Sequence, residues 1–152
     1  FSLPNSRGDF SKIKISNKKL FLIDESYNSN PLSLEFAIKH FDSLKFKNKK
    51  KYLLLGDMLE MGKFSKTLHR NIAKIINKTS IDKVYVYGKD IKETYYAISP
   101  DKRGKILSNI NEIYNLIKND LNNNDYLMIK GSNSTGLNKF VTKIKKERIN
   151  AL

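Results

Sequence analysis

Short apolar runs alternate with segments of helical periodicity along most of the chain, and this alternation is what most restricts the fold. Three of the runs end in glycine: YLLLG at 52–56, KVYVYG at 83–88 and YLMIKG at 126–131. Between them, apolar residues recur every three to four positions near 32–44, 66–77, 90–98 and 111–121. Nearly continuous apolar strands joined by crossover helices are typical of parallel sheets that are covered on both faces.

The remaining segments complete this pattern. Residues 11–16 and 19–24 flank the turn-like pair Asn17-Lys18 and predict a hairpin. A weak strand is expected at 105–107 and a last helix from Gly136 to Arg148. We therefore predict an α/β fold: a Rossmann-like, doubly wound, mostly parallel sheet with one antiparallel edge strand and helices on both faces. At 152 residues the chain fits a single domain, 1–152, and no linker or repeat divides it.

Composition narrows the possible functions. There are no cysteines, which excludes disulfides and thiolate metal sites and fits a reducing, cytoplasmic location. No run approaches the roughly 18 to 20 apolar residues of a membrane span, so we expect no membrane insertion. The formal net charge is +14, which would suit a nucleic-acid partner. The lysines, however, are spread over every element and only four basic residues are arginine. We interpret them as a solvated surface and expect no nucleic-acid binding.

Three polar segments follow three of the predicted strands. They are DESYNSNP at 24–31, GDMLEMGKFS at 56–65 and KGSNSTG at 130–136. In open α/β sheets, ligands bind beyond the carboxyl ends of the strands, where helix N-termini present unpaired N–H groups. Three such segments at one edge of one sheet predict a binding site there.

Each segment also has a purely structural interpretation. Asn30-Pro31 is a good helix start, which leaves Asp24, Tyr27 and Asn28 as candidates for contacts with a ribose and a base. KGSNSTG lacks the G-x-x-x-x-G-K-[ST] spacing of a phosphate loop, and a turn with an N-cap from Ser134 or Thr135 explains it equally well. Loop solvation or capping would account for Asp57 and Glu60. We interpret His40 and His69 as surface or semi-buried structural histidines.

Taken together, these segments resemble the C-terminal domain of the Mur ligases, above all the branch that adds D-alanyl-D-alanine. That branch typically reads D-D-S-Y-N-A-N-P, then G-D-M-L-E-L-G and L-H-R, then K-G-S-R-S. The match runs from about Ser6 to Phe140, with Glu25, Ser29 and Asn133 as departures. Because residue 1 is not Met, we expect this chain to be a third domain whose N-terminal and central ATPase domains lie upstream.

The resemblance implies roles for individual residues. Arg7 is expected to reach the ATP phosphates when the domains close, and Asp24 to contact the nucleotide ribose. The residues implied along the adenine are Tyr27, Asn28, Asn30 and Pro31. Those implied at the incoming amino-acid substrate are Lys130, Ser132 and Ser134. Asp57 and Glu60 match a motif without an assigned role, and no metal ligand is implied in this domain.

The implied activity is a bacterial, cytoplasmic, ATP- and Mg²⁺-dependent amide ligation that joins D-alanyl-D-alanine to UDP-N-acetylmuramoyl-tripeptide for peptidoglycan synthesis. The chain's partners would be the other domains of its own enzyme and these two substrates. Three alternatives stay open: a stand-alone nucleotide-binding module, the third domain of another Mur or folylpolyglutamate-type ligase, and a nucleic-acid-binding protein.

Overall fold

A six-stranded sheet forms the centre of the computed structural model, which describes residues 9–26, 28–132 and 135–146. The strand order is β1-β2-β6-β3-β4-β5. The strands are β1 (Asp9–Ile15), β2 (Lys18–Glu25), β3 (Lys51–Gly56), β4 (Lys83–Tyr87), β5 (Arg103–Leu107) and β6 (Asp125–Lys130). Only the β1–β2 pair is antiparallel among the pairings of the described residues. The predicted fold class, including the antiparallel edge, is confirmed.

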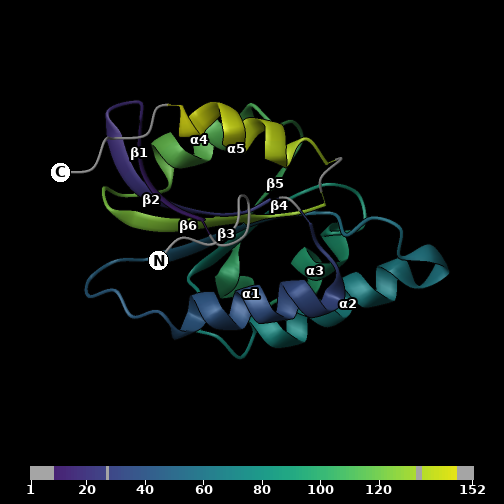
Figure 1. Ribbon diagram of the computed structural model, residues 1–152. Coiled ribbons are helices and arrows are strands. Elements are labelled where there is room, and N and C mark those ends of the chain that lie inside the picture. The colour runs from purple at the N-terminus through teal and green to yellow at the C-terminus, as the bar shows by residue number, and fades with distance from the viewer. Residues whose placement is uncertain (1–8, 27, 133–134, 147–152) are drawn as a thin grey trace.

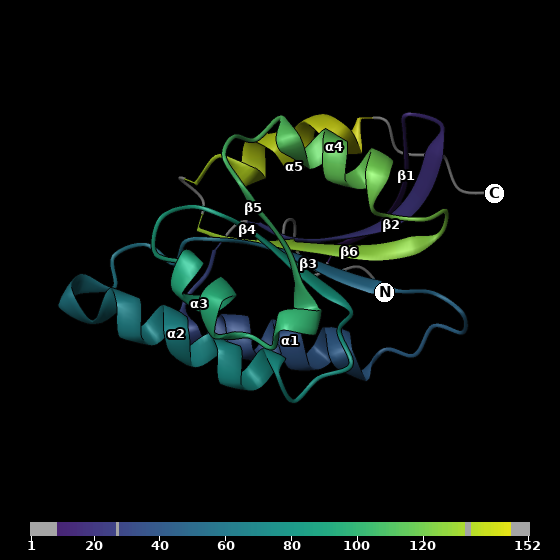
Figure 2. The same ribbon diagram turned by 180° about the vertical axis from the view of Figure 1, so that it is seen from behind.

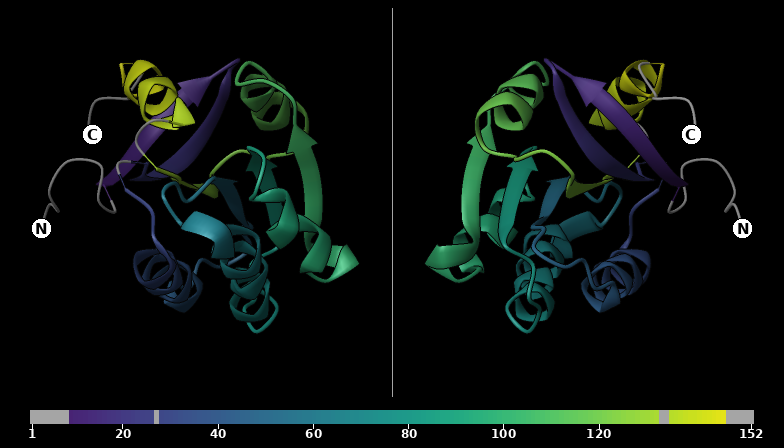
Figure 3. Two further views of the ribbon diagram at one scale, coloured as in Figure 1. Left: turned by 90° about the vertical axis from the view of Figure 1, so that its right-hand side faces the viewer. Right: turned by 90° about the vertical axis from the view of Figure 1, so that its left-hand side faces the viewer.

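Helices cover both faces of the sheet (Figure 1). α4 (Glu112–Asn119) and α5 (Leu137–Lys145) lie on one face, and Figure 2 shows the same layering from behind. α1 (Pro31–Ser43), α2 (Ser65–Ile76) and α3 (Lys92–Ala97) lie on the other, as the view along the strands in Figure 3 makes clear. Two short 3₁₀ turns, Gly62–Phe64 and Pro100–Lys102, precede α2 and β5. The expected end of the last helix at Arg148 lies outside the described residues.

Two apolar clusters hold these layers together, one on each face of the sheet. Successive side chains along a strand belong to different clusters. Leu54 and Ile129 pack toward α4 and α5, whereas Leu53 and Met128 pack toward α1 and α2. Every residue of β3 is buried, as expected for a central parallel strand covered on both sides. Because successive apolar side chains of a strand point to opposite faces of the sheet, both faces are apolar and both are covered by helices.

Side chains satisfy the backbone groups at both ends of α1: local residues do so at its N-terminus, and Lys51 of β3 does so at its C-terminus. Asn30 Oδ1 accepts the Ser33 N–H at 2.9 Å and Ser33 Oγ accepts the Asn30 N–H at 3.0 Å, which completes a capping box. At the other end, buried Lys51 donates to the carbonyls of Asp42 and Leu44, each at 2.8 Å. Burial lowers the pKa of Lys51, and the nearby Asp42 carboxylate partly offsets that effect.

Candidate functional site

The three polar segments meet at one edge of the sheet because β2, β6 and β3 are adjacent and parallel. This is the right-hand edge in Figure 1. Two glycines bring the ends of β3 and β6 close together. A Cβ on Gly131 would lie 3.1 Å from the Gly56 Cα and 2.9 Å from a Leu137 methyl, and one on Gly56 would lie 2.6 Å from the same methyl. A larger residue at either strand end would therefore displace the Leu137 side chain.

Ser132 joins the three segments. Its N–H donates to the Asp57 carbonyl at 3.0 Å. Its hydroxyl accepts the Leu59 N–H at 2.9 Å and donates to the Ser29 carbonyl at 3.3 Å. Ser132 is buried. Ser132, which was predicted to face the amino-acid substrate, thus connects the three loops by hydrogen bonds.

The predicted nucleotide segment after β2 is partly engaged within the protein. Asp24 is 2% exposed; its Oδ1 accepts from the N–H and hydroxyl of Ser26, and its Oδ2 forms an ion pair with Lys145 Nζ at 3.1 Å. Lys130 is also buried and donates to the Asn28 carbonyl at 2.7 Å. Asn28 is exposed. Among the described residues of this segment, Asn28 is therefore the most accessible to a ligand.

Asn30 and Pro31 serve as the N-cap and the first residue of α1. Because the Asn30 carboxamide oxygen already accepts the Ser33 N–H, the helix start accounts for both residues. Three predicted site residues, Arg7, Tyr27 and Ser134, lie outside the described residues, as does Asn133.

The loop after β3 is anchored by two side chains. Asp57 accepts the Ile91 N–H at 2.8 Å and the Lys89 N–H at 3.0 Å, so it caps the turn that leads into α3. His69 is fully buried; its Nε2 accepts the Met58 N–H at 2.9 Å, which leaves Nδ1–H to donate to the Ser65 carbonyl at 2.7 Å. Glu60 is exposed with a φ of 62°. His69 is a structural histidine, as expected, although it is more deeply buried than its position in the sequence indicated.

A cleft of about 570 Å³ opens beside this loop, at the carboxyl ends of β3, β4 and β5. Its polar lining includes Asp57, Lys89, Lys92, Ser108 and Thr135. Sequence analysis singled out Asp57 and named Thr135 as a possible cap, but it missed Lys89, Lys92 and Ser108. A signal was present for two of them, because Lys89 and Ser108 directly follow the predicted strands 83–88 and 105–107. The rule that ligands bind beyond strand ends, applied to every strand, would have found these two. Lys92 is the first residue of α3 and does not directly follow a strand.

Metal binding and membrane crossing can also be checked on the described part of the chain. Across residues 9–26, 28–132 and 135–146, no three His, Asp or Glu side chains come together in a way that could hold a metal ion. None of the helices in those ranges is long and apolar enough to cross a bilayer.

Fold and site together define an open α/β domain that holds polar loops beyond the carboxyl ends of its strands. The profile of the family described as "Mur ligase, glutamate ligase domain" matches residues 11–133. The chain therefore belongs to the Mur ligase C-terminal domain family, and the resemblance seen in the three motifs is confirmed.

Individual relatives agree with this assignment. The chain is 41% identical over 70 residues to the UDP-N-acetylmuramoyl-tripeptide–D-alanyl-D-alanine ligase of Bacillus subtilis, covering 46% of this chain and 15% of that protein. It is 32% identical over 148 residues to the ligase of the same name from Buchnera aphidicola subsp. Baizongia pistaciae, covering 96% of this chain and 31% of the relative. This chain thus spans about a third or less of the relatives it matches.

A solved structure shares the fold. The MurF ligase of Thermotoga maritima, crystallised in complex with ADP, superposes with a TM-score of 0.75 at 20% identity, over 97% of this chain and 32% of that one. At this identity the superposition supports the fold alone.

Proposed function

We propose that this chain is the C-terminal domain of an ATP-dependent ligase that joins D-alanyl-D-alanine to UDP-N-acetylmuramoyl-tripeptide. One observation carries the proposal. The three motif segments that resemble this branch lie at a single edge of the sheet, where hydrogen bonds of Ser132 connect them. The match of 96% of this chain to about a third of a ligase of that name supports the same assignment.

The proposed reaction forms an amide in two steps. A carboxylate oxygen of the tripeptide attacks the γ-phosphorus of ATP, and ADP leaves to give an acyl phosphate. The amine of the dipeptide then adds to the acyl carbon, and the tetrahedral intermediate collapses with loss of inorganic phosphate and a proton. Bound Mg²⁺ would stabilise charge on the transferring phosphoryl group. The family resemblance assigns the ligands of this ion to the expected central domain.

This chain's own contribution would be positioning. We expect Arg7 to reach the phosphates and Tyr27 and Asn28 to border the base. Asp24 is ion-paired to Lys145 at 3.1 Å, so a ribose hydroxyl would have to share that carboxylate with Lys145. The loops tied by Ser132 would hold the dipeptide amine in line with the acyl phosphate once the domains close.

Two enzyme variants test these roles. In the full-length ligase, Arg7→Ala and Asp24→Asn should each lower the ligation rate by on the order of 10- to 100-fold, equivalent to about 1.5 to 3 kcal/mol for one lost charge-assisted contact. Binding of the UDP-linked substrate, measured by calorimetry, should be unchanged because its pocket is expected in the other domains. Unchanged ligation in both variants would contradict the assigned roles.

The alternatives predict different behaviour. A stand-alone module would bind ATP tightly without other domains. A folylpolyglutamate-type ligase would use glutamate as its amine substrate. The match of SYNSNP and GDMLEMG to the D-alanyl-D-alanine branch favours the first proposal over both.

A further inference from the structure

An aromatic strip crosses the sheet from Phe10 of β1, which pairs with Ile23, through Phe21 of β2 to Tyr126 near the amino end of β6. Phe21 stacks on Tyr126 with centroids 4.7 Å apart, and Phe46 from the α1–β3 loop stacks on the other side of Tyr126. Phe10 contacts both Phe21 and Tyr126, at 6.2 and 5.9 Å. Although it belongs to this cluster, Phe10 remains 50% exposed. The strip therefore presents one large apolar side chain to its surroundings.

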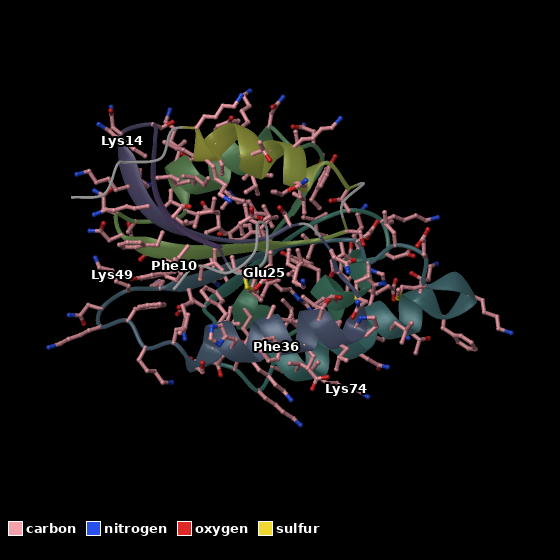
Figure 4. The ribbon with its side chains drawn as sticks, viewed as in Figure 1. Phe10, Lys14, Glu25, Phe36, Lys49 and Lys74 are labelled. Carbon is pink, nitrogen blue, oxygen red and sulfur yellow. The ribbon has the colours of Figure 1, made fainter. Side chains whose placement is uncertain are left out.

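Lysines outnumber acidic residues along this strip, where Asp9 precedes Phe10 and buried Asp125 precedes Tyr126. The two segments that build most of it, 10–22 and 44–51, contain no Asp or Glu. Lys12 Nζ lies 5.4 Å from the centre of the Phe21 ring, and exposed Lys14, Lys19 and Lys47 lie in the same segments. We call the whole surface the amino-end patch; it comprises Phe10, Phe21, Phe46, Tyr126, Lys12, Lys14, Lys19, Lys47 and Lys49. In Figure 4, Lys14 and Lys49 lie at the left of the molecule, away from the candidate site, and Phe10 lies nearer the centre.

Two of these lysines face each other across a strand pair. In the β1–β2 register Lys14 stands opposite Lys19. Like charges directly opposite one another destabilise a hairpin. No ion pair within the described residues compensates either ammonium group. An external anion would remove this repulsion.

We propose that the amino-end patch binds an anionic membrane surface, with the lysines at the lipid phosphates and Phe10 in the headgroup region. Each lysine close to such a surface contributes without any fixed geometry. Single-stranded nucleic acid fits less well, because base stacking needs free ring faces. Here Tyr126 is already covered by Phe21 on one side and Phe46 on the other. This contact is peripheral, because Lys14 and Lys19 lie beside the β1–β2 turn, at the end of β2 away from the candidate site.

The test is co-sedimentation of the 152-residue chain with vesicles of phosphatidylcholine alone and with vesicles that also contain roughly one third of the anionic lipid phosphatidylglycerol. Binding is expected only with the anionic lipid and should fall with added salt. The triple variant Lys14→Gln/Lys19→Gln/Lys47→Gln should bind on the order of 100-fold more weakly. Its melting temperature should be equal or higher, because the repulsion between Lys14 and Lys19 is gone. Phe10→Ser should also weaken binding.

A variant with the same net charge distinguishes binding by the amino-end patch from binding that depends only on the net charge of the chain. Lys66→Gln/Lys74→Gln/Lys78→Gln removes the same charge from exposed positions on and just after α2, and it should keep most of the binding. An equal loss in both triple variants would overturn the proposal, as would an absence of binding to anionic vesicles. Preferential, patch-dependent binding to single-stranded poly(U) would overturn it in favour of a nucleic-acid surface.

Discussion

Ser26 and Ser29, three positions apart, have buried hydroxyls with opposite effects on the stability of the same loop. The Ser26 hydroxyl donates to Asp24 at 2.5 Å and also contacts Asn138. The Ser29 hydroxyl is buried and has no hydrogen-bond partner among the described residues. A buried polar group without a partner keeps its full desolvation cost. Ser29 stands where the resembling family has Ala, so the departure noted in the sequence has an energetic consequence.

Ser29→Ala should therefore stabilise the chain by about 1 kcal/mol, because it removes an unsatisfied hydroxyl. Ser26→Ala should destabilise it by about 1.5 to 3 kcal/mol, because the buried Asp24 carboxylate loses a donor. For a chain of this size each kcal/mol shifts the melting temperature by about 2 to 4 °C. Thermal unfolding followed by circular dichroism measures both. Shifts of the same sign in the two variants would contradict the hydrogen-bond assignment.

The candidate site shows where residue-level prediction ends. The sequence correctly identified the segments that meet at the sheet edge, because strand ends are set by local patterns. It did not reveal that Asp24 pairs with Lys145 or that Ser132 holds three loops together. Both are contacts between residues more than 70 positions apart, and a single sequence contains no local signal for such pairs.

Among the elements, the predicted helices and strands agree closely with the structure because apolar periodicity and glycine-terminated runs are strong local signals. Side-chain contacts between elements could not be predicted from the sequence in the same way. Lys51 was read as part of a solvated lysine run, yet it is buried and caps the C-terminal end of α1. Tyr52 donates to the Asp120 carbonyl and Tyr85 to the Asp120 carboxylate, just after the last residue of α4.

These tyrosines make the fold sensitive to alkaline pH. Burial raises the pKa of Tyr52 to about 12, with nearby Asp125, Asp82 and Asp120 adding to the effect. Burial and the Asp120 hydrogen bond raise the pKa of Tyr85 further. The unfolded phenol titrates near pH 10, so the folded state binds more protons above that pH. Stability from Tyr52 is complete below about pH 10 and is lost as the pH rises toward 12.

Urea denaturation between pH 8.5 and 11.5 measures this loss. Each buried phenol should contribute a slope of up to about 1.4 kcal/mol per pH unit above pH 10. Tyr52→Phe should show a shallower decline than the unaltered chain, while deprotonation of exposed lysines affects both alike. Parallel curves would show that Tyr52 titrates normally in the folded protein.

At the scale of the whole molecule, the candidate site is one wall of a larger binding region in our proposal. One contact each from Arg7 and Asp24 contributes about 1.5 to 3 kcal/mol, whereas millimolar binding already requires about 4.1 kcal/mol after association entropy. The isolated chain should therefore bind ATP with a dissociation constant in the millimolar range or weaker, and should not ligate. Isothermal titration calorimetry on residues 1–152 checks this, and a micromolar constant would favour a stand-alone nucleotide-binding module.

The central claim is the identity of the amine substrate, and one assay addresses it directly. The full-length enzyme containing this chain would be supplied with ATP, Mg²⁺ and UDP-N-acetylmuramoyl-tripeptide, and phosphate release would be followed with different amines. We predict release that depends on D-alanyl-D-alanine and is near background with D-alanine or L-glutamate. Release driven by glutamate, or independent of D-alanyl-D-alanine, would contradict the proposed function.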